Sequence, residues 1–124
     1  MFTGLVKEIG KITRISQLGN GIDCSIEASE KFINDIMIGD SINVNGICST
    51  VISKNTTTFN VQYLEETLNK TTMKYVNESE IVNLEPCLTL STKLGGHLVS
   101  GHIDNTGVIQ SLTYDGEWAV IKIT

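Results

Sequence analysis

The sequence has little positive charge and no long apolar run. Only 9 of its 124 residues are Lys or Arg, against 14 Asp and Glu, which gives a net charge of −5. A general nucleic-acid binder needs a basic face for the phosphate backbone, so this balance argues against that class. No stretch approaches the length of apolar sequence that spans a membrane. We therefore expect neither a nucleic-acid partner nor a membrane partner.

Cysteine is also scarce. The three cysteines, Cys24, Cys48 and Cys87, are odd in number and have no C-x-x-C spacing. This argues against a disulfide framework and against a zinc site, and it favours a reducing cytoplasm. The start of the chain lacks a basic region leading into an apolar one, so no secretory signal is predicted. A cytoplasmic protein without a bound metal or cofactor is expected.

The residues that are present predict an all-β globular domain. Apolar residues make up 40% of the chain and charged residues 19%, which is a globular composition. Short β-rich runs alternate with Gly and Asn turns, the pattern of a small closed barrel. We predict a six-stranded Greek-key closed β-barrel with a short helix or two. The strands are expected at 5–15, 22–27, 41–44, 48–52, 57–61 and 81–84.

Local signals refine this prediction. Asn45-Gly46 between two apolar runs is a strong hairpin signal. Ser29 can cap a short helix with Phe32, Ile33 and Ile36 on one face. Gly10 lies inside the first strand, as at a bulge or bend. The polar run 65–71 interrupts the β pattern and predicts a short helix or turn.

The opening of the chain is repeated near its end. Residues 2–6 read FTGLV and are followed by Gly10, and residues 99–103 read VSGHI and are followed by Gly107. Such a repeat is typical of one structural unit carried twice. We expect a first barrel over 1–97, a boundary near the Gly-Gly pair at 95–96, and the first hairpin of a truncated second unit over 98–124. Open hairpin edges invite pairing, so this tail should pack on its own barrel, swap with another copy or be disordered.

Several residues could carry chemistry, and each has a plainer alternative. Cys48 could be a nucleophile if a basic neighbour lowers its pKa, or a small core residue. His97 and His102 are five apart, which puts them on opposite faces of a strand and disfavours a shared metal. One histidine could act as a general base. Segment 62–68 could hold a heterocycle edge through backbone amides, or simply begin an acidic helix.

Four ordered segments together resemble the α-type riboflavin synthase family of lumazine-binding proteins. They are MFTG at 1–4, GDS with VNGIC over 39–48, ETL at 66–68 with Thr71, and GGH with SGHID over 95–104. The resemblance implies two similar barrels in a full-length homotrimer, with a dimer as one option for this chain. It also implies conversion of two molecules of 6,7-dimethyl-8-ribityllumazine into riboflavin and 5-amino-6-ribitylaminouracil, without a metal or redox cofactor.

The resemblance also implies the site residues. Ser41, Cys48 and His102 match polar positions considered for catalysis, with His102 suited to proton transfer. Holding the two rings face to face is expected to provide a large part of the acceleration. Ser49 replaces an expected apolar residue, which predicts a more polar pocket wall. The expected substrate contacts are Gly4, Leu5, Val6, Cys48, Ser49, Thr50, Gln62, Tyr63, Leu64, Glu65, Glu66, Thr67, Gly101, His102 and Ile103.

Two other functions compete with this interpretation. A non-catalytic antenna-type protein would keep the fold and bind a lumazine or flavin at one site. A plain β-barrel interaction module would bind no heterocycle and would tolerate changes at Thr50 or Thr67. The intact set of Ser41, Cys48, the Glu66-Thr67 pair and His102 favours the enzyme. Without the rest of the second barrel, this chain is expected to bind ligand with little or no turnover.

Overall fold

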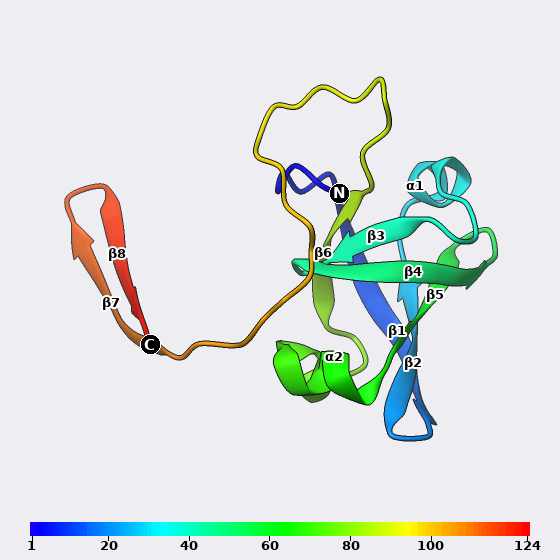
Figure 1. Ribbon diagram of the computed structural model, residues 1–124, viewed down its shortest axis with the longest axis horizontal. Helices are drawn as coiled ribbons and strands as arrows, with labels where there is room; N and C mark the ends of the chain where they lie inside the picture. The colour runs from blue at the N-terminus through cyan, green and yellow to red at the C-terminus, as the bar shows by residue number, and fades with distance from the viewer.

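The computed structural model describes all 124 residues and contains a closed six-stranded barrel and a separate two-stranded hairpin (Figure 1). The antiparallel barrel strands follow the order β1-β2-β5-β4-β3-β6. Strands β3, β4 and β5 are consecutive neighbours and β6 returns beside β3, which is a Greek key. The predicted fold is confirmed. The barrel strands are β1 (Glu8–Leu18), β2 (Gly21–Glu27), β3 (Ser41–Val44), β4 (Ile47–Lys54), β5 (Thr58–Tyr63) and β6 (Ile81–Pro86).

Alternation along the strands builds the core. In β4 the side chains of Ile47, Ser49 and Val51 are buried, whereas Thr50 between them is exposed. In β5, Phe59, Val61 and Tyr63 are buried in the same alternating way. Because successive side chains of a strand point to opposite faces, the odd-numbered residues of β5 and those of β4 up to Val51 fill the barrel, and the even-numbered ones between them do not.

Three short helices close the ends of the barrel. They are α1 (Glu30–Asp35), α2 (Glu65–Lys70) and the 3-10 helix η1 (Thr72–Tyr75). The Ser29 side chain accepts a hydrogen bond from the Phe32 amide at 3.2 Å, which confirms the predicted N-cap of α1.

None of the helices has the length and apolar character needed to span a membrane.

The turns explain where the strands begin and end. Asn45 and Gly46 have φ values of 50° and 93°, as the predicted tight hairpin requires. Strand β1 runs from residue 8 to 18 rather than from 5 to 15. The turn to β2 consists of Gly19 and Asn20 alone, so the strand continues to Leu18. Residues before Glu8 leave the barrel wall and form a separate N-terminal segment.

Gly10 has a different role from the predicted one. The β1 bulge lies between Ile12 and Arg14, not at Gly10. A Cβ on Gly10 would lie 2.7 Å from Leu84 Cδ1 and 3.0 Å from Ile26 Cγ2. A side chain at this position would force Leu84 and Ile26 to shift, which explains the glycine in the barrel wall.

A long loop after β6 leads past the N-terminus and across the barrel to the hairpin of β7 (Ile109–Asp115) and β8 (Trp118–Ile123) (Figure 1). These two strands pair only with each other. Figure 1 shows them standing apart from the barrel, so packing on its own barrel, one of the three arrangements expected for the tail, is not observed for the hairpin.

Candidate functional site

The repeated segment near the C-terminus lies across the first barrel. We call residues 99–103 the crossing segment. Its Val99 exchanges two backbone hydrogen bonds with Phe2, at 2.9 and 3.0 Å. The Cys48 amide then donates to the Gly101 carbonyl at 2.9 Å. The crossing segment is thus held by the N-terminal segment at one end and by the start of β4 at the other.

The structure supports the sequence repeat at the level of the backbone. Gly4 and Gly101 both have positive φ, 83° and 77°. The residues on either side of each glycine make the same local hydrogen bond. The Leu5 amide donates to Thr3 Oγ1 at 3.1 Å, and the His102 amide donates to Ser100 Oγ at 3.1 Å. The two copies therefore share a conformation as well as a spacing.

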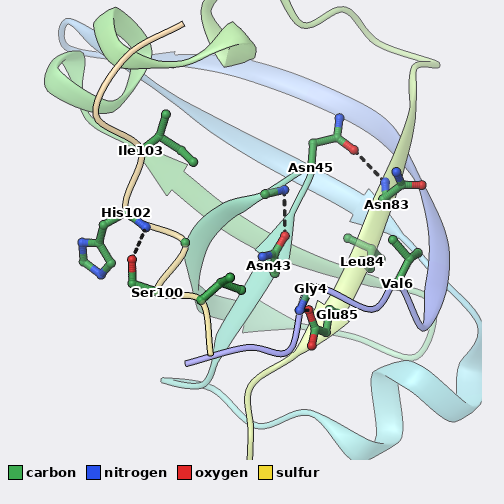
Figure 2. Close-up of a pocket in the computed structure, with 13 residues that line it drawn as sticks. Gly4, Val6, Asn43, Asn45, Asn83, Leu84, Glu85, Ser100, His102 and Ile103 are labelled. Atoms are coloured by element: carbon green, nitrogen blue, oxygen red, sulfur yellow. Dashed lines mark hydrogen bonds between the residues drawn. The ribbon is translucent and has the colours of Figure 1, made fainter. Parts of the chain in front are cut away.

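The larger cavity, about 710 Å³, lies between the N-terminal segment, the crossing segment and the outer faces of β3 and β6 (Figure 2). Amide side chains line its barrel side. Asn43 accepts from the Gly46 amide at 2.7 Å, and Asn45 accepts from the Asn83 amide at 2.7 Å. Figure 2 shows the His102 ring directed away from Asn43 and Asn45. The cavity also contains Gly4, Val6, Gly46, Leu84, Glu85, Val99, Ser100, Gly101 and Ile103.

A second cavity of about 310 Å³ lies on the other side of the crossing segment. It brings together residues from three predicted segments: Cys48 from β4, Glu66 and Thr67 from α2, and Gly101 and His102 from the crossing segment. The remaining lining residues are Ile47, Lys70, Thr71, Ile103 and Asp104. Gly101, His102 and Ile103 are common to both cavities.

Charge in the second cavity is concentrated at its α2 side. Lys70 Nζ donates to Glu66 Oε1 at 2.8 Å, and this hydrogen bond lowers the pKa of Glu66. The same bond raises the pKa of Lys70, to which Asp104 adds a smaller effect in the same direction. Both side chains are exposed, so we assign the pair no role in stability. Together with Asp104, the pair places one cation and two carboxylates on the lining of this cavity.

The cavities leave out several predicted contact residues. Thr50 faces outward on β4. Ser41 begins β3, where its carbonyl accepts from the Cys87 amide at 3.1 Å. The Gln62 side chain is bound to Asp23, with 3.1 Å between Nε2 and Oδ2. Leu5, Leu64 and Glu65 are exposed and line neither cavity.

Ser49 and Tyr63 lie inside the barrel. Ser49 is 2% exposed, and its hydroxyl is 2.7 Å from the Tyr63 hydroxyl and 3.1 Å from the Ile47 carbonyl oxygen. The predicted polar pocket wall at Ser49 is therefore not found, because its hydroxyl is used within the core. Neither Ser49 nor Tyr63 lines either cavity.

Some cavity residues had not been predicted. Lys70 follows the recognised Glu66 by one helical turn, and i, i+4 spacing could have indicated it. Asn43, Asn83 and Glu85 come from β3 and β6, which are neighbours only in the closed barrel. No three His, Cys, Asp or Glu side chains converge closely enough to hold a metal ion.

Comparison with known proteins agrees with this geometry. The family model described as "Lumazine binding domain" matches residues 3–86. The chain is 40% identical over 124 residues to riboflavin synthase of Actinobacillus pleuropneumoniae, covering 98% of this chain and 57% of that protein. It is 41% identical over 109 residues to riboflavin synthase of Bacillus amyloliquefaciens, covering 88% and 50%. The chain thus spans about half the length of the curated relatives it matches.

Among solved structures, the chain resembles LumP complexed with 6,7-dimethyl-8-(1'-D-ribityl) lumazine. The TM-score is 0.84 at 23% identity, covering 99% of this chain and 68% of that one. A second match is LumP complexed with riboflavin, with the same TM-score and identity. At this identity the likeness supports the fold, including the placement of the hairpin after the barrel.

Proposed function

We propose that this chain, which belongs to the lumazine-binding domain family, supplies the first substrate-binding barrel of a riboflavin synthase. The complete reaction would convert two molecules of 6,7-dimethyl-8-ribityllumazine into riboflavin and 5-amino-6-ribitylaminouracil. The atoms of the two substrates equal those of the two products, so the transfer of a four-carbon unit needs no external oxidant. The curated relatives at about 40% identity are riboflavin synthases, which favours the enzyme over a non-catalytic antenna-type protein.

The observation that carries this proposal is the meeting of distant segments at the second cavity. Cys48, the Glu66-Thr67 pair and the crossing segment lie far apart in the sequence and line one space of about 310 Å³. Backbone and side-chain groups arranged in this way suit a flat heterocycle with a polar edge. We propose that one lumazine binds here, with Gly101 and Ile103 along its face.

The chemistry requires a proton transfer and a nucleophile. The C7 methyl of the donor lumazine is acidic because its carbanion delocalises into the ring, and a base must take that proton. The acceptor lumazine is attacked at its own C7 by a nucleophile, which is water or a side chain. We propose His102 as the group that moves the proton, directly or through water, and Cys48 as a polar assistant, whereas Ser41 lines neither cavity and is assigned no role. Positioning the two rings contributes more than any of these groups.

The organisation of the longer protein belongs to the same proposal. We infer that residues 1–97 make up the first unit and that 98–124 begin the second. This division is supported by the shared conformation of the two repeat copies. A cytoplasmic location, and a homotrimer for the longer protein, follow from the resemblance to the family.

Fluorescence titration tests the binding step. The chain is added, to tens of micromolar, to 6,7-dimethyl-8-ribityllumazine, and a saturable change in ligand emission is expected. Thr67→Val should weaken binding because Thr67 lines the cavity, whereas Thr56→Val in the exposed β4–β5 turn should not. Riboflavin formation should require a longer protein with a second barrel. An unchanged emission signal from the unmodified chain would reject the proposed function.

A further inference from the structure

Glu85 is a buried carboxylate with no basic partner, and it contacts the N-terminal segment rather than the second cavity. We propose that Glu85 is the positioning residue that fixes the crossing segment over the barrel. One consequence of this inference, a change in lumazine affinity, rests on the proposed function. The position of the crossing segment can be measured without any ligand.

Three donors converge on this one side chain. Glu85 is 5% exposed. Its Oε1 accepts from the Thr3 amide at 2.6 Å and from Thr3 Oγ1 at 2.5 Å, and its Oε2 accepts from the Gly4 amide at 3.1 Å. Glu85 is absent from the one ion pair of the structure, Lys70–Glu66. A buried carboxylate is costly unless hydrogen-bonded, so these three bonds compensate its burial and orient the N-terminal segment.

The N-terminal segment passes this constraint to the crossing segment. Phe2, next to Thr3, exchanges its two backbone hydrogen bonds with Val99. The Thr3 carbonyl also accepts from the His97 amide at 2.9 Å. Two residues after Val99, the Gly101 carbonyl meets the Cys48 amide at the second cavity. Three sets of hydrogen bonds, linked by one or two residues of backbone, therefore connect Glu85 to the residues that flank the proposed ligand.

The carboxylate is chemically specific for this task. Both of its oxygens accept from N–H or O–H donors of Thr3 and Gly4. Glutamine has nearly the same shape but offers one oxygen and one NH₂ group. In Glu85→Gln, an NH₂ group would have to face a backbone N–H, so at least one bond to the N-terminal segment must be lost. Glu80→Gln is the matched control, because Glu80 directly precedes β6 and its carboxylate accepts only from the Asn77 amide and side chain.

Amide hydrogen exchange of the whole chain tests the positioning directly. In Glu85→Gln we expect the amides of Thr3, Gly4 and Val99 to exchange about tenfold faster or more, as for the loss of a charged hydrogen bond, while β5 amides stay unchanged. In the same variant, the dissociation constant for 6,7-dimethyl-8-ribityllumazine should rise about tenfold. Glu80→Gln should alter neither measurement.

Thr3 variants provide an independent route if Glu85→Gln does not fold. Thr3→Val removes the hydroxyl that donates to Glu85 and should loosen the Val99 amide, whereas Thr3→Ser keeps the hydroxyl and should restore its protection. Unchanged exchange at Val99 in both Glu85→Gln and Thr3→Val would overturn the inference. So would an unchanged affinity in a variant whose Val99 amide has been loosened. If the unmodified chain binds no lumazine, the proposed function fails, and exchange at Val99 alone decides the role of Glu85.

Discussion

Phe2 and Val99 occupy equivalent positions of the internal repeat and hydrogen-bond to each other through their backbones in both directions. Mutual pairing of equivalent residues is the local signature of a two-fold axis, as in an isologous interface. The crossing segment lies on the first barrel, where Gly101 meets Cys48. By the same symmetry, we expect the N-terminal segment at Gly4 to lie on a second barrel in the longer protein. Each barrel would then have its cavity closed by the other unit.

Gly101→Ala should disrupt ligand binding. Gly101 has a φ of 77°, and a Cβ there would lie 2.9 Å from the Cys48 amide nitrogen and 3.1 Å from the Phe2 ring. The substitution combines backbone strain of about 1–2 kcal/mol with a backbone clash, so the crossing segment must move. We expect lumazine affinity, measured by fluorescence titration, to fall about tenfold or more.

Gly116→Ala is the control for this effect. Gly116 has a φ of 61° in the β7–β8 turn, and a Cβ there would meet nothing within 4 Å. It therefore carries the strain of a positive φ without the clash and lies away from both cavities. Equal loss of affinity in the two variants would show that strain, and not the position of the crossing segment, determines binding.

The Ser49–Tyr63 pair should contribute to stability as a unit. Tyr63→Phe leaves the Ser49 hydroxyl bonded to the Ile47 carbonyl and should cost about 1 kcal/mol. Ser49→Ala leaves the Tyr63 hydroxyl buried without a partner and should cost about 1–3 kcal/mol. Because the double variant removes both hydroxyls, its cost in urea unfolding should be below the sum of the single costs. Additive costs would contradict the coupling.

The barrel was predictable because its signals are local. The Asn45-Gly46 turn and the Ser29 cap specify backbone conformations within a few residues, and both are confirmed. The alternation of Ile47 and Val51 also indicates that Ser49 points inward, whereas the family resemblance suggested a pocket wall. Glu85 and Asn83 could not be assigned to the site, since only barrel closure brings β6 beside β3 and the N-terminal segment.

Alkaline pH should destabilise the barrel through Cys24. Burial raises the pKa of the Cys24 thiol from 9.0 to about 11, and Asp23 adds to the shift. Above about pH 9 the unfolded chain loses this proton while the folded chain keeps it, so stability is complete below pH 9 and falls as pH rises towards 11. The slope is at most about 1.4 kcal/mol per pH unit for one group.

Urea unfolding at several pH values between 8 and 11 measures this dependence. Burial also raises the pKa of Tyr63, which adds a decline of the same sign at higher pH. Cys24→Ala should reduce the slope between pH 9 and 11, and the half-buried Cys87 provides the control variant Cys87→Ala, which should not. A slope that is the same in both variants would assign the alkaline loss to other groups.

The β7–β8 hairpin should unfold before the barrel. Its apolar side chains are exposed, including Trp118 at 79% and Tyr114 at 76%, and a two-stranded sheet alone is marginally stable in water. Trp118 is the only tryptophan, so its fluorescence reports on the hairpin while far-ultraviolet circular dichroism is dominated by the barrel strands. In urea, the Trp118 transition should precede the circular dichroism transition.

Val120→Lys should shift the Trp118 transition without changing the circular dichroism transition, since β7 and β8 pair only with each other. Coincident transitions at every protein concentration would contradict this and indicate that the hairpin packs on its own barrel, whereas coincidence only at high concentration would indicate that a second copy covers it.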